Sequence, residues 1–175
     1  MFRLTLGIWL VLGCLNSRYA WSTTVVPQSL QQLTDKAVLI AIAEAQSKTT
    51  RWQGGRIMTD TQMRIKELWK GHYTKELLSV TTLGGIVGEI GQYVPGSAQL
   101  SLGAVVLVFL VPGKTTGWRV VAMGQGVLPL RQDRQDLEIA RPQTRLHGPI
   151  PPAKLSYELM SLTSLKKEIL QWVAP

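Results

Sequence analysis

The sequence contains very few of the residues that form covalent cross-links or metal centres. Its 175 residues include one cysteine, Cys14, and two histidines, His72 and His147. A single cysteine excludes an intrachain disulfide, so the fold must be stable through its core alone. Neither histidine lies in a HExxH motif or in another spacing typical of zinc ligands. We therefore expect no metal site and no cofactor.

The sequence also lacks an apolar stretch long enough to cross a bilayer as a helix, which needs about 20 residues. The run from Leu4 to Leu15 is shorter, follows a single charge at Arg3, and precedes a polar segment that ends with Ala20 and Ser22. This layout is typical of a bacterial export signal. We predict that residues 1–22 are an export signal cleaved after Ser22, which places the mature chain in the periplasm or outside the cell.

The position of the cysteine allows a second interpretation of the same segment. The residues Leu10-Val11-Leu12-Gly13 precede Cys14 and resemble a bacterial lipoprotein box. Cleavage of a lipoprotein signal at 1–13 would leave Cys14 as a lipidated first residue, and two or three acyl chains anchor a protein stably to a membrane. Both signals stay open, and mass spectrometry of the mature N-terminus distinguishes them.

Patterns that support catalysis are missing as well. No strand-to-helix nucleophile elbow surrounds Ser79, Ser97 or Ser101. Glu67 and Glu89 are a conceivable carboxylate pair, but a glycosidase needs two carboxylates at a fixed separation across a cleft, which sequence spacing does not show. We therefore predict that the protein is not an enzyme.

Acidic residues are scarce relative to basic ones. The chain has 19 Lys and Arg against 11 Asp and Glu, a net charge of +8. Removing Arg3 and Arg18 with the signal lowers this to +6, because each carries one positive charge. A basic exported protein can meet anionic lipid, polysaccharide or an acidic partner, although ordinary solubility explains the surplus more simply.

What the sequence does contain is a series of short strand patterns. After a loosely packed lead-in at 23–34, the continuous apolar run 37–43 predicts a central strand, and the polar segment 48–55 predicts a loop. Residues 56–66 alternate with a period of two between apolar or threonine side chains and side chains that are charged or polar except for Met58. This pattern predicts a strand with one buried and one exposed face. Further strands are predicted at 76–82, 104–111, 118–123 and 127–130.

Glycines interrupt these strands at one place in particular. Gly84, Gly85 and Gly88 can cradle an anion through backbone N–H groups, but the segment lacks the Lys-Ser/Thr of a phosphate loop and no helix pattern follows. We predict instead a structural turn, a bent hairpin at a corner of the sheet, where glycine tolerates a positive φ.

The end of the chain lacks the strand patterns of the preceding segments. Residues 131–153 are charged and rich in proline, which predicts a peripheral excursion without a core. Within 154–175, Leu165, Ile169 and other apolar residues recur at helical spacing, and Ser161 or Thr163 can cap the helix. We predict one C-terminal helix.

Together these patterns predict a mainly β fold, a small closed or partly open antiparallel barrel at 35–130 followed by an α-helix. The order of elements from Asp35 to Leu130 resembles an uncharacterised family of exported bacterial domains. The resemblance is carried by Gly55-Arg56-Ile57, Glu67 to Gly71, Gly84 to Gly88, Gly103 to Leu110 and Trp118 to Gly126.

The same order is also similar to the netrin-like module of tissue inhibitors of metalloproteinases, an OB-type barrel with a helix. This resemblance implies a module that binds a protein partner. Those inhibitors chelate the protease zinc through an N-terminal cysteine, whereas Cys14 becomes N-terminal only after lipoprotein cleavage, when acylation blocks its amine. Zinc chelation is therefore not transferred to this chain.

A candidate binding face follows from the strand patterns. OB-type barrels bind ligands through basic and aromatic faces, although export argues against a nucleic-acid ligand. Trp118 is either a core residue or an exposed ring. The candidate residues are Arg56, Arg64, Lys66, Trp69, Trp118 and Arg119.

The function expected from the sequence is that of an exported, non-enzymatic binding module of the bacterial cell envelope. Its expected partner is an envelope or extracellular protein, and a membrane is contacted only through a lipid on Cys14. Two alternatives stay open: a lipid-anchored structural envelope protein, and an inhibitor of an exported metalloprotease.

Overall fold

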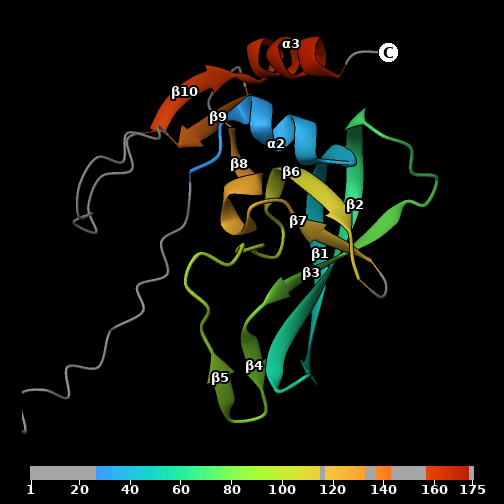
Figure 1. Cartoon of the computed structure of the whole chain (residues 1–175), viewed down its shortest axis with the longest axis vertical. Helices are drawn as coiled ribbons and strands as arrows, with labels where there is room; N and C mark the ends of the chain where they lie inside the picture. Colours follow the sequence, from blue (N-terminus) through green and yellow to red (C-terminus); the bar gives the residue numbers. More distant parts are fainter. Residues whose placement is uncertain (1–26, 115–116, 133–136, 143–156, 174–175) are drawn as a thin grey trace, which may run out of the picture.

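The computed structural model describes residues 27–114, 117–132, 137–142 and 157–173 (Figure 1). Both predicted signals, Cys14 and the first part of the lead-in lie outside the described residues. Within the described part of the chain, no helix is long and apolar enough to cross a membrane.

Five strands form a sheet that closes on itself. They are β1 (Leu39–Gln53), β2 (Arg56–Lys70), β3 (Leu77–Leu83), β6 (Val105–Pro112) and β7 (Trp118–Val120). The order is β1-β2-β3-β7-β6, and β6 pairs again with β1. The β3–β7 pair is parallel and the other pairs are antiparallel. The closed sheet therefore differs from the predicted antiparallel barrel in this one parallel pair.

The first two strands are longer than the sequence predicts. Strand β1 continues to Gln53, so the predicted loop at 48–55 is wrong except for its last two residues, Gly54 and Gly55. These glycines have φ angles of 57° and 73°, which suit a two-residue hairpin turn. The second half of β1 is polar because it projects beyond the barrel core and is largely exposed, not because it forms a loop.

The predicted alternation in β2 is confirmed, and the buried face of this strand points into the barrel interior. Ile57, Thr59, Thr61 and Met63 are buried, whereas Arg64 is exposed. The buried residues of this inner core are Leu39, Ala43, Ala45, Met63, Leu78, Val80, Leu100, Val106, Val108 and Leu110.

A second core lies on the outer side of the barrel, under two helices. Helices α2 (Leu30–Lys36) and α3 (Leu162–Trp172) lie together at one end of the molecule (Figure 1). The buried residues of this outer core are Leu30, Leu33, Ala37, Ile40, Ile42, Trp69, Leu107, Phe109, Val121, Leu128, Leu165 and Ile169.

Helix α2 corrects the predicted loose lead-in. Ser29 accepts a hydrogen bond from the Gln32 N–H, and the Gln32 side chain accepts one from the Ser29 N–H, which together form a capping box. The spacing Ser-x-x-Gln before an apolar residue is a known start of a helix. Leu30 and Leu33 are then buried against the barrel.

The chain after the barrel continues the sheet from β6. Strands β8 (Val127–Gln132), β9 (Leu137–Pro142) and β10 (Tyr157–Ser161) follow one another in antiparallel pairs. The predicted excursion at 131–153 therefore contains a strand, because the end of β8 offers its edge to β9. The predicted C-terminal helix is confirmed and begins after Ser161, whose hydroxyl accepts from the Ser164 N–H at 3.2 Å.

The glycine-rich segment forms the predicted hairpin. Strands β4 (Gly85–Val87) and β5 (Ile90–Gln92) pair beyond the barrel end opposite the helices (Figure 1). Gly84, Gly85 and Gly88 have φ angles of 91°, 138° and 60°. The structural turn predicted at these glycines is confirmed.

Helix α3 is held to the barrel by an ion pair as well as by its apolar face. The Lys166 ammonium on α3 donates to the Glu67 carboxylate on β2. This hydrogen bond lowers the pKa of Glu67, and burial opposes the shift only in part.

Acid is expected to remove the contribution of this ion pair. Because the pKa of Glu67 is lowered from 4.5 in the folded protein, the pair stabilises it fully above that value, and the contribution is lost as the pH falls through the lowered pKa. Both side chains are about two-fifths exposed, so Glu67→Gln costs at most about 1 kcal/mol near neutral pH. Urea unfolding should separate the variant from the wild type near neutral pH, and less so at a pH well below 4.5. Glu76→Gln, at a more exposed carboxylate, is the control, and an equal difference at both pH values would contradict the assignment.

Candidate functional site

A groove runs along the outer face of β2 and β3, between two loops of the barrel. The β1–β2 turn borders it through Gly54, and the connection between β6 and β7 borders it through Gly113 and Lys114. Its volume is about 510 Å³, within the usual range for ligand-binding clefts. The groove can therefore hold a small molecule or a short segment of another chain.

Positive charge dominates this groove. Arg51, Arg56, Lys114 and Arg119 line it, and no carboxylate is found among its described lining residues. The nearby Asp60 is already engaged, because its Oδ2 is 2.7 Å from Arg51 Nε and its Oδ1 accepts from the Thr81 hydroxyl at 2.5 Å. The groove therefore has an unbalanced positive charge.

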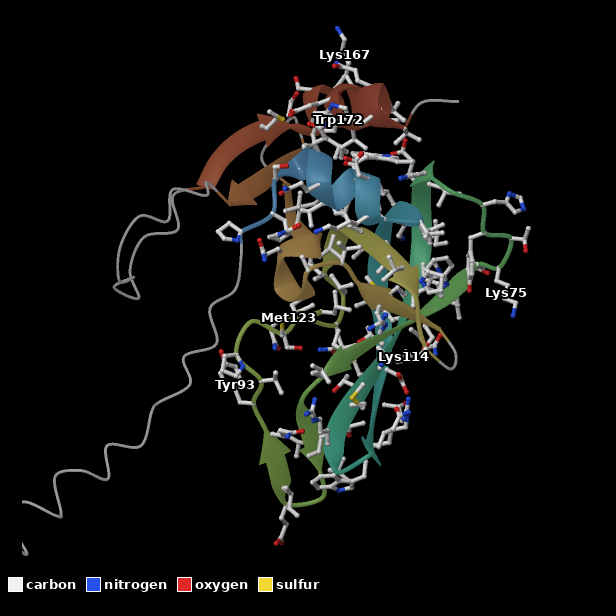
Figure 2. The ribbon with its side chains drawn as sticks, viewed as in Figure 1. Lys75, Tyr93, Lys114, Met123, Lys167 and Trp172 are labelled. Atoms are coloured by element: carbon white, nitrogen blue, oxygen red, sulfur yellow. The ribbon has the colours of Figure 1, made fainter. Side chains whose placement is uncertain are left out.

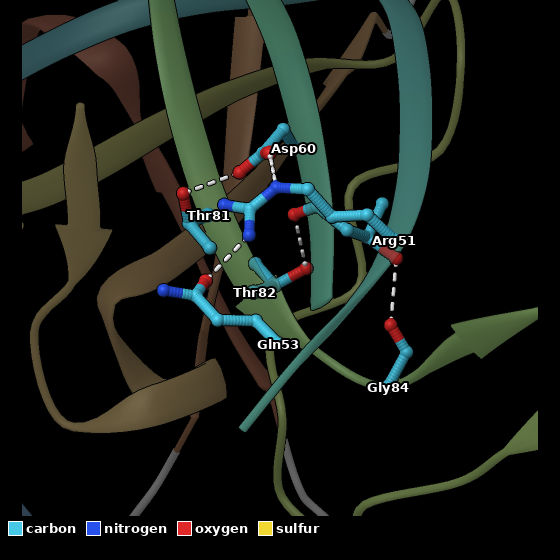
Figure 3. A network of polar contacts seen from close by, with 7 residues as sticks. Arg51, Gln53, Asp60, Thr81, Thr82 and Gly84 are labelled. Carbon is cyan, nitrogen blue, oxygen red and sulfur yellow. Dashed lines mark hydrogen bonds and ion pairs between the residues drawn. The ribbon is translucent and has the colours of Figure 1, made fainter. Parts of the chain in front are cut away.

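One of these cations is fixed in place and three are available. Figure 3 shows Arg51 held between Asp60 and Gln53, whose Oε1 accepts from Arg51 Nη1 at 2.5 Å. Arg56, Lys114 and Arg119 form no ion pair with any described residue, and all three are exposed. An anionic group in the groove can therefore bind them without first displacing another carboxylate.

The rest of the lining is apolar and adaptable. Met58, Leu83, Val120 and Met123 contribute apolar surface, and methionine side chains adjust to irregular partners. Ala122 and Met123 have φ angles of 50° and 58°, which are unfavourable for residues other than glycine. Such strain often lies at binding sites, and Met123, whose position Figure 2 shows, belongs to the groove lining.

The structure brings together only part of the predicted binding face. Arg56 and Arg119 line the groove, whereas Arg64 and Lys66 lie farther along β2 and are paired with carboxylates. Arg64 Nε is 3.1 Å from Glu76 Oε1, and Lys66 Nζ is 2.6 Å from Glu44 Oε2. The hydrogen bond from Lys66 lowers the pKa of Glu44. Because their charges are compensated, Arg64 and Lys66 contribute less than Arg56 and Arg119 to attracting an anion.

The two predicted tryptophans lie in or against the cores. Trp69 is only 5% exposed and belongs to the outer core under the helices, so its assignment to an exposed face is corrected. Register irregularities between β1 and β2 near Ile40 and Ile42 interrupt the alternation at this end of β2. Trp118 is half-buried, packs against the inner core and contacts Tyr73 edge-to-face, with ring centroids 6.0 Å apart.

Of the described residues that line the groove, sequence reasoning identified only Arg56 and Arg119, and it missed Arg51, Lys114 and Met123 among others. Arg51 lies in the segment predicted as a loop, and Lys114 lies between two predicted strands, at 104–111 and 118–123. Met123 is the last residue of the second of these predicted strands. The sequence signal for Arg51 and Lys114 is their positive charge close to the two turns that border the groove, the β1–β2 turn and the β6–β7 connection.

The carboxylates considered for catalysis lie far apart. Glu67 contacts α3, whereas Glu89 lies in the β4–β5 turn at the opposite end of the molecule (Figure 1). Among the described residues, no group of three or more His, Cys, Asp or Glu side chains is placed to hold a metal ion.

Comparisons with known proteins give no relatives. No protein-family model matches the chain, and neither a curated protein nor a solved structure matches it. We therefore infer the function from the geometry and charge of the groove.

Proposed function

We propose that this protein is a non-enzymatic binding module whose groove holds an acidic segment of a partner protein. The observation that carries the proposal is the groove lining, with four cations and no carboxylate. Arginine binds carboxylates through paired, charge-assisted hydrogen bonds, and complementary charge accelerates association and selects the partner. Arg56 and Arg119 recognise the acidic side chains, and the apolar residues pack against their neighbours.

The barrel topology supports an OB-type assignment. The order β1-β2-β3-β7-β6, the return of β6 to β1 and the parallel β3–β7 pair fit a five-stranded Greek-key barrel. OB-type barrels bind ligands on the face of the second and third strands, between the loops that follow the first and fourth strands. The groove occupies the corresponding position, and the added helix α3 fits the netrin-like variant.

A protein partner agrees with the groove better than a nucleic acid does. Stacking of bases on aromatic side chains supports most single-strand binding by such barrels. In the part of the chain that the structure describes, no aromatic residue lines the groove, whereas its methionine and leucine side chains suit the apolar side chains of a peptide. The proposed location is the bacterial cell envelope, because the first 22 residues have the layout of an export signal.

A labelled peptide that alternates glutamate with leucine tests this function. We expect the purified protein to bind it, to ignore the matching lysine peptide, and to lose affinity about tenfold as salt rises, because the contact is electrostatic. Arg56→Glu combined with Arg119→Glu should weaken binding about 100-fold, since two attractions become repulsions. Fluorescence anisotropy gives the dissociation constants.

A matched pair of charge reversals controls for net charge. Lys75→Glu with Lys167→Glu changes the total charge equally at exposed sites away from the groove (Figure 2). These substitutions should change affinity less than about threefold, because the groove is intact. An equal loss in both double variants, or tighter binding of single-stranded DNA than of the acidic peptide, would refute the proposal.

A further inference from the structure

A second cavity lies under the β4–β5 hairpin, at the barrel end opposite the helices. Its volume is about 600 Å³. Thr59 and Thr61 line it from the inner face of β2, which is opposite the face that carries Arg56 and Met58. This recess is therefore separate from the cationic groove, although Thr82, Leu83 and Ala98 border both.

Glycine allows the hairpin to cover the threonines closely. A Cβ atom on Gly85 would lie 2.5 Å from Thr59 Oγ1 and 2.9 Å from Thr50 Cγ2. Because no side chain separates them, the hairpin backbone packs directly on the threonine side chains that line the recess.

Most of these hydroxyls retain the ability to accept hydrogen bonds. Thr50 Oγ1 donates to the Ile86 carbonyl at 2.5 Å, and Thr59 Oγ1 donates to the Gly84 carbonyl at 2.6 Å. Each has thereby used its only proton and keeps oxygen lone pairs. Gln92 Oε1 accepts from the Ile57 N–H at 2.6 Å, which leaves the Gln92 amide nitrogen as a donor.

One hydroxyl in the recess has no partner at all among the described residues. Thr61 Oγ1 is buried without a hydrogen bond, and Thr61 is 0% exposed. A buried hydroxyl in a folded protein is normally satisfied by protein, water or ligand. Thr61 therefore marks a position where a hydroxylated ligand gains a hydrogen bond that the protein itself does not provide.

The charge of the recess differs from that of the groove. Of the described residues in its lining, Lys48 alone is charged, against four in the groove. Tyr93, whose position Figure 2 shows, belongs to the lining and is 80% exposed, so its aromatic ring is open to a ligand. An acyl chain would leave the Thr61 hydroxyl buried without a partner. A strongly acidic ligand would meet threonine oxygens that can only accept hydrogen bonds, with a single cation among the described lining residues.

We propose that this recess binds a short segment of neutral carbohydrate. Sugar hydroxyls donate to the lone pairs of Thr50 and Thr59, pair with the Thr61 hydroxyl, and accept from the Gln92 amide. The C–H face of a sugar ring packs on Tyr93. This site is independent of the proposed function, because it shares none of the groove's cations.

Calorimetric titration of the purified full chain with two neutral trisaccharides tests the proposal. Maltotriose carries hydroxyls only, and chitotriose adds N-acetyl groups, so the pair distinguishes a plain glucan from an N-acetylated envelope glycan. We expect at least one of them to bind with a dissociation constant below about 1 mM. Absence of binding by both sugars at several times that concentration would overturn the proposal.

Two substitutions locate the binding in the recess. Thr61→Val keeps the side-chain shape and removes the unpartnered hydroxyl, and Tyr93→Ala removes an exposed ring that the fold does not need. Each should weaken binding about tenfold, as expected for one lost hydrogen bond or one stacking contact. Tyr93→Phe should retain the wild-type affinity, as should Leu102→Ala, at an exposed apolar residue outside the recess.

The controls separate this site from the groove. Arg56→Glu with Arg119→Glu should leave sugar binding unchanged, even if the acidic peptide does not bind at all. Wild-type sugar affinity in both Thr61→Val and Tyr93→Ala, or displacement of the sugar by the acidic peptide, would refute the carbohydrate site.

Discussion

Replacing Phe109 by alanine is expected to lower the free energy of unfolding by about 3 to 5 kcal/mol. Phe109 is 0% exposed and is among the largest fully buried side chains of the described residues. It lies on β6 opposite Ile40 of β1 and belongs to the outer core that α2 and α3 cover. Its removal leaves a cavity between the barrel and both helices.

The size of the effect follows from the position of β6. This strand pairs with β1, β7 and β8, and its two faces are buried in different cores. Phe109 faces the helices, whereas Leu110 faces the barrel interior. Relaxation around Phe109 is limited because the strand cannot shift without disturbing both cores.

Urea unfolding followed by circular dichroism measures this effect. Phe109→Leu should cost no more than about 1.5 kcal/mol, because it keeps most of the buried apolar volume. Leu102→Ala, at a residue that is 59% exposed, should cost less than about 0.5 kcal/mol. A loss below about 1 kcal/mol for Phe109→Ala would mean that the helices do not cover this face of the barrel.

The elements that sequence reasoning found are those with a strong local pattern. The alternation from Arg56 to Lys66 gives β2, the apolar run at 104–111 gives β6, and the spacing of Leu165 and Ile169 gives α3. In each case the side chains alone show which face is buried. The mainly β fold with a terminal helix could therefore be predicted.

The elements it missed depend on contacts between distant segments. The second half of β1 is polar because it extends beyond the barrel, and only its pairing with β2 makes it a strand. Helix α2 is short, and its apolar residues gain their environment from α3 and β6. Trp69 enters the outer core only because the β1–β2 register is irregular and two helices cover that end.

The candidate groove was predictable only in part, for the same reason. Arg56 and Arg119 were identified from their charge and from the strand patterns. Their proximity depends on the parallel pairing of β3 with β7, which brings Arg119 beside Thr81. Arg51 joins them from β1, so no single stretch of sequence contains the groove.

Replacing Gly85 by alanine is expected to destabilise the protein by about 3 kcal/mol, whereas Gly88→Ala should cost about 1 kcal/mol. Both glycines have positive φ, 138° and 60°, and lie in the same hairpin. A Cβ on Gly88 meets nothing within 4 Å, so only the left-handed backbone is penalised. At Gly85 the added atom would also collide with Thr59, Thr50 and the Ile57 methyl group, at 2.5, 2.9 and 3.3 Å.

The two substitutions therefore separate backbone strain from steric contact within one hairpin. Urea unfolding gives the stability of each variant, and sugar titration of the folded variants adds a second measure. The new methyl group of Gly85→Ala enters the recess between the hairpin and the threonines, so this variant should lose stability and sugar affinity together. Gly88→Ala should lose stability only. Equal destabilisation by the two changes would mean that the hairpin does not rest on the barrel threonines, and the recess would then lack the close backbone contact that defines it.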